Sequence, residues 1–121
     1  MTAHGIFNIN QIENMDLIVI MGNLMDNAIE AAENVQDGFL KIYLYTQNNA
    51  HFSVIKVINN YIQEIEEDRG ILLTIKEDKG KHGFGIKNIK AVTEKYNGYF
   101  ECFYQNKIFT AVVIIPNKEY E

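Results

Sequence analysis

Two stretches of the sequence combine residue types that could hold a metal ion and phosphate groups. The first runs from Gly22 to Ala31 and places Asn23, Asn27 and Glu30 at i, i+4 and i+7, which is one face of a helix. Asn is a mediocre helix former, so two of them one turn apart in a largely apolar helix need a reason. Mg²⁺ is often held by one or two protein oxygens together with substrate phosphates. The stripe therefore predicts a magnesium site, and solvated helix surface is the alternative.

The second stretch is rich in glycine and leads into a helix. It runs from Gly80 to Ile89 and has further glycines at Gly83 and Gly85. Glycines let backbone N–H groups approach a phosphate, and the helix N-terminus adds a favourable dipole. The pattern is neither a P-loop nor a dinucleotide-binding fingerprint. By itself it is a weak signal, since a glycine-rich helix entry without a ligand explains it equally well.

Two helices must position these stretches. Asn14 or Asp16 is expected to cap the first helix, and Gly38 to end it within a few residues. The second helix is expected to start near Gly85 and to stop at Asn97-Gly98. Their buried faces recur at spacings of three and four. The first face comprises Leu17, Met21, Leu24, Ala28 and Ala31, and the second comprises Ile86, Ile89, Val92 and Tyr96.

Strand-like runs rich in Ile, Val, Tyr and Phe form two predicted antiparallel hairpins. The first joins 39–45 to 52–58, and the second joins 99–104 to 108–115, with Pro116 closing the last strand. Residues 1–10 read as an extended segment with Ile6 and Ile9 as possible core contacts. Residues 60–82 have no clean period, and such a long loop in a compact domain is usually functional or mobile. The expected fold is α+β, a two-layer sandwich with a mixed, mostly antiparallel sheet and helices on one face.

Composition bounds the class of protein. The 121 residues are 47% hydrophobic and 22% charged, which indicates one globular domain over 1–121. The net charge of −5 and a single Arg argue against a nucleic-acid partner. A single cysteine, Cys102, gives no internal disulfide, and no apolar run is long enough to span a membrane.

The two stretches together resemble the GHKL (Bergerat-fold) ATPases, which include the ATP-binding domains of sensor histidine kinases. Gly22–Ala31 resembles the N box of that family, and 81–86 resembles its second glycine box. The subgroup with the most similar motifs has Thr-x-Lys, here Thr74-Ile75-Lys76, followed by His-Gly-x-Gly. It contains the Agr-type and VirS-type peptide-sensing kinases of quorum sensing, and it also resembles the CitA-like kinases. The resemblance covers nearly all of the chain.

The resemblance implies roles for the asparagines. Asn27 matches the residue that binds Mg²⁺. Asn23 matches the position at which GHKL hydrolases carry a glutamate base, and an amide cannot take a proton from water at neutral pH. The chain therefore resembles a phosphotransferase rather than a hydrolase. Asn59 stands where the family usually has the aspartate that accepts from adenine, without the usual glycines, and Asn60 is the alternative adenine contact.

The resemblance also implies a lid over the triphosphate, at about 60–82. Backbone N–H groups of the second glycine box would face the phosphates, and side chains of the lid would close over them. The residues concerned are Lys76, Lys79, His82, Gly83, Phe84 and Gly85. For the lysines a solvated surface, and for His82 a structural role, are the alternative interpretations.

The implied cofactors are ATP and Mg²⁺. The implied function is transfer of the γ-phosphoryl group to a histidine on a dimerisation domain that is not in this chain, with a response regulator downstream and no direct contact with a membrane. The expected location is the cytoplasm, as the cytoplasmic portion of a membrane-bound receptor kinase. Two alternatives remain: a non-catalytic nucleotide-binding or interaction module of the same fold, and an anti-sigma-factor type serine kinase.

Overall fold

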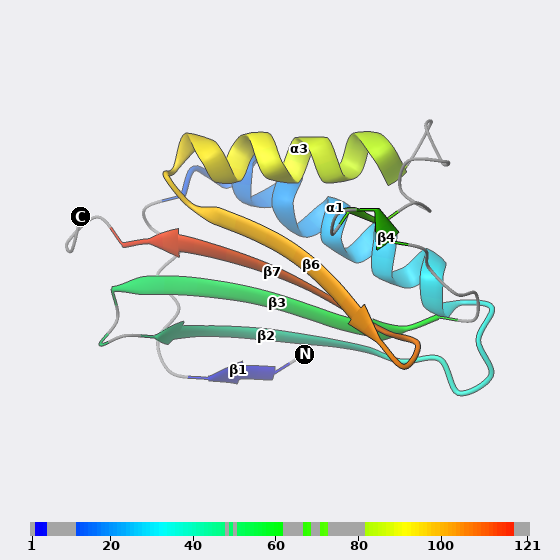
Figure 1. The fold of residues 1–121 in the computed structure, drawn as a ribbon. Helices are drawn as coiled ribbons and strands as arrows, with labels where there is room; N and C mark the ends of the chain where they lie inside the picture. Colours follow the sequence, from blue (N-terminus) through cyan, green and yellow to red (C-terminus); the bar gives the residue numbers. More distant parts are fainter. Residues whose placement is uncertain are drawn as a thin grey trace.

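The protein folds into two layers, a five-stranded sheet with helices α1 and α3 lying over one face (Figure 1). This computed structural model describes residues 2–4, 12–47, 49, 51–61, 67–68, 71–72 and 82–117. The helices are α1 (Asn14–Ala32) and α3 (His82–Lys95). The strands of the main sheet are β1 (Thr2–His4), β2 (Leu40–Gln47), β3 (Phe52–Asn60), β6 (Tyr99–Gln105) and β7 (Ile108–Pro116).

The strand order is β1-β2-β3-β7-β6. β1 runs parallel to β2, and the other neighbours are antiparallel. Both predicted hairpins form, and their strands are one or two residues longer than the sequence indicated. The second hairpin turns tightly at Asn106 and Lys107, whose φ angles of 53° and 63° suit a two-residue turn. The predicted α+β sandwich is therefore confirmed.

The core lies between the sheet and the helices. Alternate residues of each strand face the helices, as the pleat of a strand requires. On the sheet side the core includes Ile42, Ile55, Val57, Ala111, Val113 and Ile115. Ile20 and Leu24 of α1 and Ile89 of α3 meet them and are at most 2% exposed. Each such side chain contributes about 1.5–3 kcal/mol by leaving water, which holds both helices firmly on the sheet.

Both predicted ends of α1 were wrong. The N-cap is Glu13, without a side-chain capping hydrogen bond, and Asp16 lies in the first turn, where it contacts α3 instead. The helix ends at Ala32, six residues before Gly38. The residues between follow successive tight turns, in which Val35 N donates to Ala32 O and Gly38 N donates to Val35 O.

The predicted start of α3 was wrong, but its end is confirmed. α3 begins at His82 rather than near Gly85, because residues of a first turn need no intrahelical N–H bond and therefore tolerate glycine. It ends where Asn97 adopts φ 58° and Gly98 N donates to Thr93 O at 2.9 Å. Such a left-handed residue and a back-reaching bond are a common helix stop.

Short strands interrupt the segment between β3 and α3. β4 (Glu67–Asp68) and β5 (Ile71–Leu72) form an antiparallel two-stranded ribbon. The expected core contacts Ile6 and Ile9 lie outside the described residues. Neither described helix is long and apolar enough to cross a membrane.

Candidate functional site

Three elements that carry the predicted site residues meet at one end of the sandwich (Figure 1). α1 and α3 pack antiparallel, since Asp16 at the start of α1 contacts Lys95 at the end of α3. The first turn of α3 therefore lies over the middle of α1, where Gly85 approaches Asn23. The end of β3 lies beside the connection that follows α1, because Asn60 Nδ2 donates to the carbonyl of Asp37, five residues after the end of that helix. The fold thus brings together residues that are far apart in the sequence.

The polar stripe of α1 has the predicted form. Asn23, Asn27 and Glu30 are half-buried, whereas Asp26 is exposed. Asn23 Nδ2 donates to the Val19 carbonyl at 2.7 Å, which fixes its amide against its own helix. The stripe presents amide and carboxylate oxygens, the ligand type that Mg²⁺ prefers.

The donor chemistry limits what kind of metal site this end of the fold can form. The described residues contain no cluster of three or more His, Cys, Asp or Glu side chains that could hold an ion. An all-protein cage of carboxylates or imidazoles is therefore not built from them. One or two helix oxygens completed by phosphate oxygens and water would fit Mg²⁺, which usually keeps several waters.

The first turn of α3 presents backbone donors. Gly83, Phe84 and Gly85 follow His82, the first residue of the helix. The first four N–H groups of a helix have no partner within it, and the helix dipole places a partial positive charge there. This turn contains no acidic residue that would repel an anion. Such a turn suits phosphate oxygens, and phosphate binding by these groups stays a prediction.

The two asparagines at the end of β3 differ in their surroundings. Asn59 faces the helices and is 1% exposed, and its Nδ2 donates to the Asn60 carbonyl at 3.0 Å. This hydrogen bond uses the NH₂ group of Asn59 and fixes which side of the amide carries the acceptor oxygen Oδ1. Asn60 has both ends of its amide engaged, because Oδ1 accepts from Phe39 N at 2.9 Å and Nδ2 donates to Asp37 O at 3.1 Å. Asn60 thus anchors the connection from α1 to β2.

Sequence reasoning missed the apolar neighbours of Asn59. Strand register places Leu40 and Phe109 on either side of it in the adjacent strands. Both are half-buried and pack against the core. Next along the chain, Tyr61 is 5% exposed and meets the Tyr104 ring edge-on, with centroids 5.7 Å apart. The signal that would have found Leu40 and Phe109 is the exact pairing register of the two hairpins.

Hydrogen bonds among Asp16, Lys95, Tyr96 and Glu13 form a joint that fixes the other ends of the two helices. Asp16 Oδ2 accepts from Lys95 Nζ at 2.8 Å and from the Tyr96 hydroxyl at 2.5 Å. That hydroxyl also accepts from Glu13 N at 3.0 Å. The hydrogen bonds from Lys95 and Tyr96 lower the pKa of Asp16 below its usual value. The hydrogen bond to Asp16 in turn raises the pKa of Lys95, so the pair stays ionised at neutral pH.

Several predicted lid residues lie outside the described residues. These are Thr74, Ile75, Lys76, Lys79 and Lys81. His82 lies at the first residue of α3, at the site end of the fold. The expected contacts of the lysines and of His82 with phosphate remain predictions.

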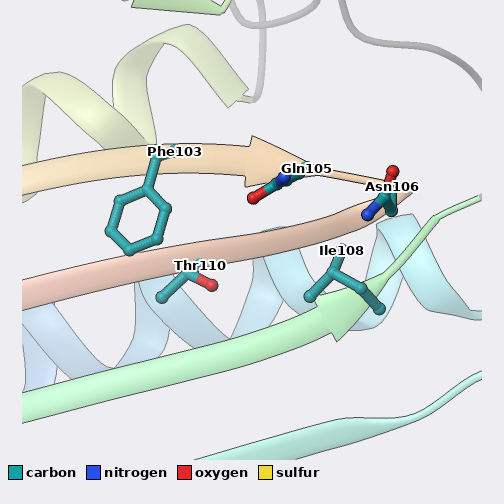
Figure 2. A pocket seen from close by; sticks show the side chains of 5 residues that line it. All are labelled: Phe103, Gln105, Asn106, Ile108 and Thr110. Carbon is teal, nitrogen blue, oxygen red and sulfur yellow. The ribbon is translucent and has the colours of Figure 1, made fainter.

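A separate hollow lies on the other face of the sheet. Its volume is about 240 Å³, and its lining comes from the hairpin of β6 and β7 (Figure 2). The lining residues are Phe103, Gln105, Asn106, Ile108 and Thr110. Phe109 and Ala111, which alternate with them along β7, pack against the core. This hollow is therefore separated from the predicted site by the sheet itself.

Comparison with known proteins decides the family. The GHKL domain family matches residues 12–116, which is most of the chain. This chain belongs to the GHKL domain family. The match includes the α1 stripe, the end of β3 and the first turn of α3, so all the described site residues lie within this GHKL domain.

One curated relative of this GHKL domain is named "Probable C4-dicarboxylate sensor kinase" and comes from Halalkalibacterium halodurans. The two are 28% identical over 107 residues, which covers 85% of this chain and 20% of the relative. The GHKL domain thus spans about one fifth of the length of that protein.

Solved structures share the fold. The catalytic domain of histidine kinase ThkA, in a nucleotide-free form, matches with a TM-score of 0.67 at 16% identity, covering 86% of this chain and 68% of that one. The blue-light activated histidine kinase EL346 of Erythrobacter litoralis matches with a TM-score of 0.69 at 10% identity, covering 95% and 33%. The GHKL domain therefore has the fold of histidine kinase catalytic domains.

Proposed function

We propose that this GHKL domain is the catalytic ATP-binding domain of a two-component sensor histidine kinase. The observation that carries the proposal is the meeting of three elements at one end of the sandwich. The half-buried Asn27 on α1, the buried Asn59 at the end of β3 and the first turn of α3 would provide different chemistry within one site. Oxygen ligands, a polar group for a base and N–H donors for phosphates together suit a nucleoside triphosphate.

The proposed metal ligand is Asn27. Its side-chain oxygen would hold Mg²⁺ together with phosphate oxygens and water, in keeping with the absence of a carboxylate or histidine cluster among the described residues. When bound, Mg²⁺ supplies charge neutralisation on the triphosphate. Asp26 and Glu30 lie on the same helix, and their negative charge favours a cation there.

The proposed adenine contact is Asn59. Its Oδ1 can accept a hydrogen bond from the exocyclic amino group of adenine, since its Nδ2 already donates to Asn60 O. Leu40 and Phe109 flank Asn59 and offer apolar surface to a purine ring. Asn60 remains a proposed neighbour of the base through its backbone, because its side chain holds the backbone of Asp37 and Phe39.

The proposed phosphate contacts are backbone N–H groups of Gly83, Phe84 and Gly85. Lys76, Lys79 and His82 of the proposed lid would add positive charge over the triphosphate. These groups orient the γ-phosphoryl and stabilise the charge that spreads over its oxygens during transfer.

The proposed reaction is transfer rather than hydrolysis. Asn23 occupies the position of the hydrolase base, and its amide cannot take a proton from water. The γ-phosphoryl would pass to a histidine on a dimerisation domain of the parent kinase, which would then serve a response regulator. We place the domain in the cytoplasm as part of a membrane-bound receptor, in the Agr/VirS-type subgroup on the strength of its Thr-x-Lys and His-Gly-Phe-Gly motifs.

Two alternatives keep the fold and change the activity. A non-catalytic nucleotide-binding or interaction module is favoured by the end of β3, which has Asn59 where an aspartate is usual and lacks glycines. An anti-sigma-factor type serine kinase is the other alternative.

An assay of phosphoryl transfer to a separate protein fragment distinguishes these functions. The domain is mixed with γ-labelled Mg-ATP and a histidine-bearing dimerisation fragment of a sensor kinase, and label on the fragment is followed with time. Acid-labile label on histidine supports the proposal, and acid-stable label on serine supports the serine kinase. ATP binding without transfer to a cognate fragment supports the non-catalytic module, and steady phosphate release without any acceptor contradicts the proposed chemistry.

A further inference from the structure

The α1 stripe approaches α3 closely at a glycine. A Cβ built on Gly85 would lie 3.0 Å from Asn23 Oδ1, 3.6 Å from Asn23 Cγ and 3.7 Å from Asn23 Cβ. All three nearest atoms belong to Asn23. A methyl group at position 85 would therefore press on the Asn23 side chain, which would have to give way by a few tenths of an ångström.

Neither partner of this contact can move away easily. Asn23 is held by the 2.7 Å hydrogen bond from its Nδ2 to the Val19 carbonyl. Gly85 is buried on the face of α3 that continues into Ile89, which is fully buried in the core. A rotation of Asn23 would break its hydrogen bond, and a shift of α3 would disturb the packing of Ile89.

Glycine within a helix otherwise reduces stability. It costs about 0.5–1 kcal/mol relative to Ala, because the unfolded chain has more freedom to lose. Gly22 of α1 shows the contrast, since a Cβ there would meet nothing within 4 Å. At Gly85 the absence of a side chain is instead matched by Asn23 on the facing helix.

We propose that Asn23 is a positioning residue that sets the first turn of α3 on α1 through its contact with Gly85. This inference rests on the proposed function and gives Asn23 a role within it. Asn27 lies one turn further along the same helix, so the contact fixes the backbone donors at 83–85 relative to the proposed metal ligand. Asn23 then affects phosphate binding through the spacing of two helices rather than by touching the phosphates.

A double-substitution cycle tests this role. The variants are Asn23→Ala, Gly85→Ala and both together, and Gly22→Ala is the matched control for adding a methyl group to a helical glycine. The Kd for Mg-ATP and for adenosine are measured by calorimetry, and the free energy of unfolding by urea titration. Adenosine lacks phosphates, so a displacement of the first turn of α3 should change its Kd little.

We expect Gly85→Ala to weaken Mg-ATP binding about tenfold, which is the size of coupling that contacting residues show. The double variant should recover most of that loss, because Asn23→Ala removes the atoms that the new methyl group meets. The affinity for adenosine should change less than about twofold in all variants. Gly22→Ala should leave both affinities unchanged.

Other outcomes overturn the inference. If the effects of the two substitutions on the Mg-ATP binding free energy are additive, the contact does not position the first turn of α3. If Asn23→Ala alone lowers Mg-ATP affinity as much as Asn27→Ala, Asn23 is a direct ligand. If the wild-type domain binds no Mg-ATP, the proposed function fails. The unfolding free energies of the four proteins then decide whether Asn23 and Gly85 act as a pair: non-additive values support the contact, and additive values contradict it.

Discussion

Replacement of Tyr96 by phenylalanine tests the joint that aligns the two helices of the site. The Tyr96 hydroxyl donates to Asp16 Oδ2 at 2.5 Å and accepts from Glu13 N at 3.0 Å. It therefore ties the end of α3 both to the N-cap and to the first turn of α1. The aromatic ring packs against the core and would remain in the variant.

The expected cost follows from the two lost hydrogen bonds. A typical intramolecular hydrogen bond contributes about 1 kcal/mol net, and one to a charged group somewhat more. Glu13 N is exposed and can bond to water instead, which limits the loss there. We therefore expect Tyr96→Phe to lower the free energy of unfolding by about 1–3 kcal/mol.

Urea unfolding followed by circular dichroism measures this change. Tyr99→Phe is the matched control, since the Tyr99 hydroxyl makes one exposed hydrogen bond to Glu101 at 3.1 Å and its side chain is 56% exposed. The control should unfold at nearly the wild-type urea concentration. If Tyr96→Phe is no more destabilising than Tyr99→Phe, the joint does not hold the helices together and the reasoning is refuted.

Three further predictions concern the same framework. The pKa of Asp16 is lowered in the folded state, so ionised Asp16 should stabilise the protein at pH values above the ordinary carboxyl pKa of 3.8. This stabilisation should be lost as the pH falls through the lower pKa of the folded state. The urea midpoints of wild type and Asp16→Asn should therefore converge at that low pH. Burial raises the pKa of Cys102 to about 12, so iodoacetamide at neutral pH should modify the protein in urea but not the native state. Gly98→Ala places a methyl group 2.5 Å from Ile114 O and should lower the free energy of unfolding by about 1–3 kcal/mol. Gly22→Ala meets no atom within 4 Å and should raise it by about 0.5–1 kcal/mol. Thermal melts that rank the two variants in the opposite order would contradict this packing.

Local sequence patterns were sufficient for the architecture. The runs rich in Ile, Val, Tyr and Phe predicted the strands, and the spacing of three and four predicted the two helices, because it matches the period of a helix. The stop of α3 at Asn97-Gly98 was also predicted, and Asn97 there adopts a positive φ.

Features that depend on tertiary contacts were not predictable. Asp16 appeared to be a helix cap, but it bonds to Lys95 and Tyr96, which are some 80 positions away in the chain. The hydrogen bonds by which the Asn60 side chain holds Asp37 and Phe39 could likewise not be read from the sequence. Such roles follow from which elements become neighbours, and one sequence does not contain that information.

The candidate site residues stay a prediction, and their geometry could not be derived from the sequence. The stripe with Asn27 and the glycine pattern that leads into the first turn of α3 were found from residue types and spacing. The approach of Gly85 to Asn23 and the flanking of Asn59 by Phe109 depend on helix packing and strand register. A change of one residue in register would place a different side chain beside Asn59.

Calorimetric titration with ATP, with and without Mg²⁺, tests the central claim most directly. Wild type is compared with Asn27→Ala and with Asn14→Ala, the same change at the exposed start of the same helix. The account predicts metal-dependent binding in wild type and in Asn14→Ala, and loss of that binding in Asn27→Ala. Equal Mg-ATP binding by Asn27→Ala and wild type, or no binding by wild type at millimolar ATP, would contradict it.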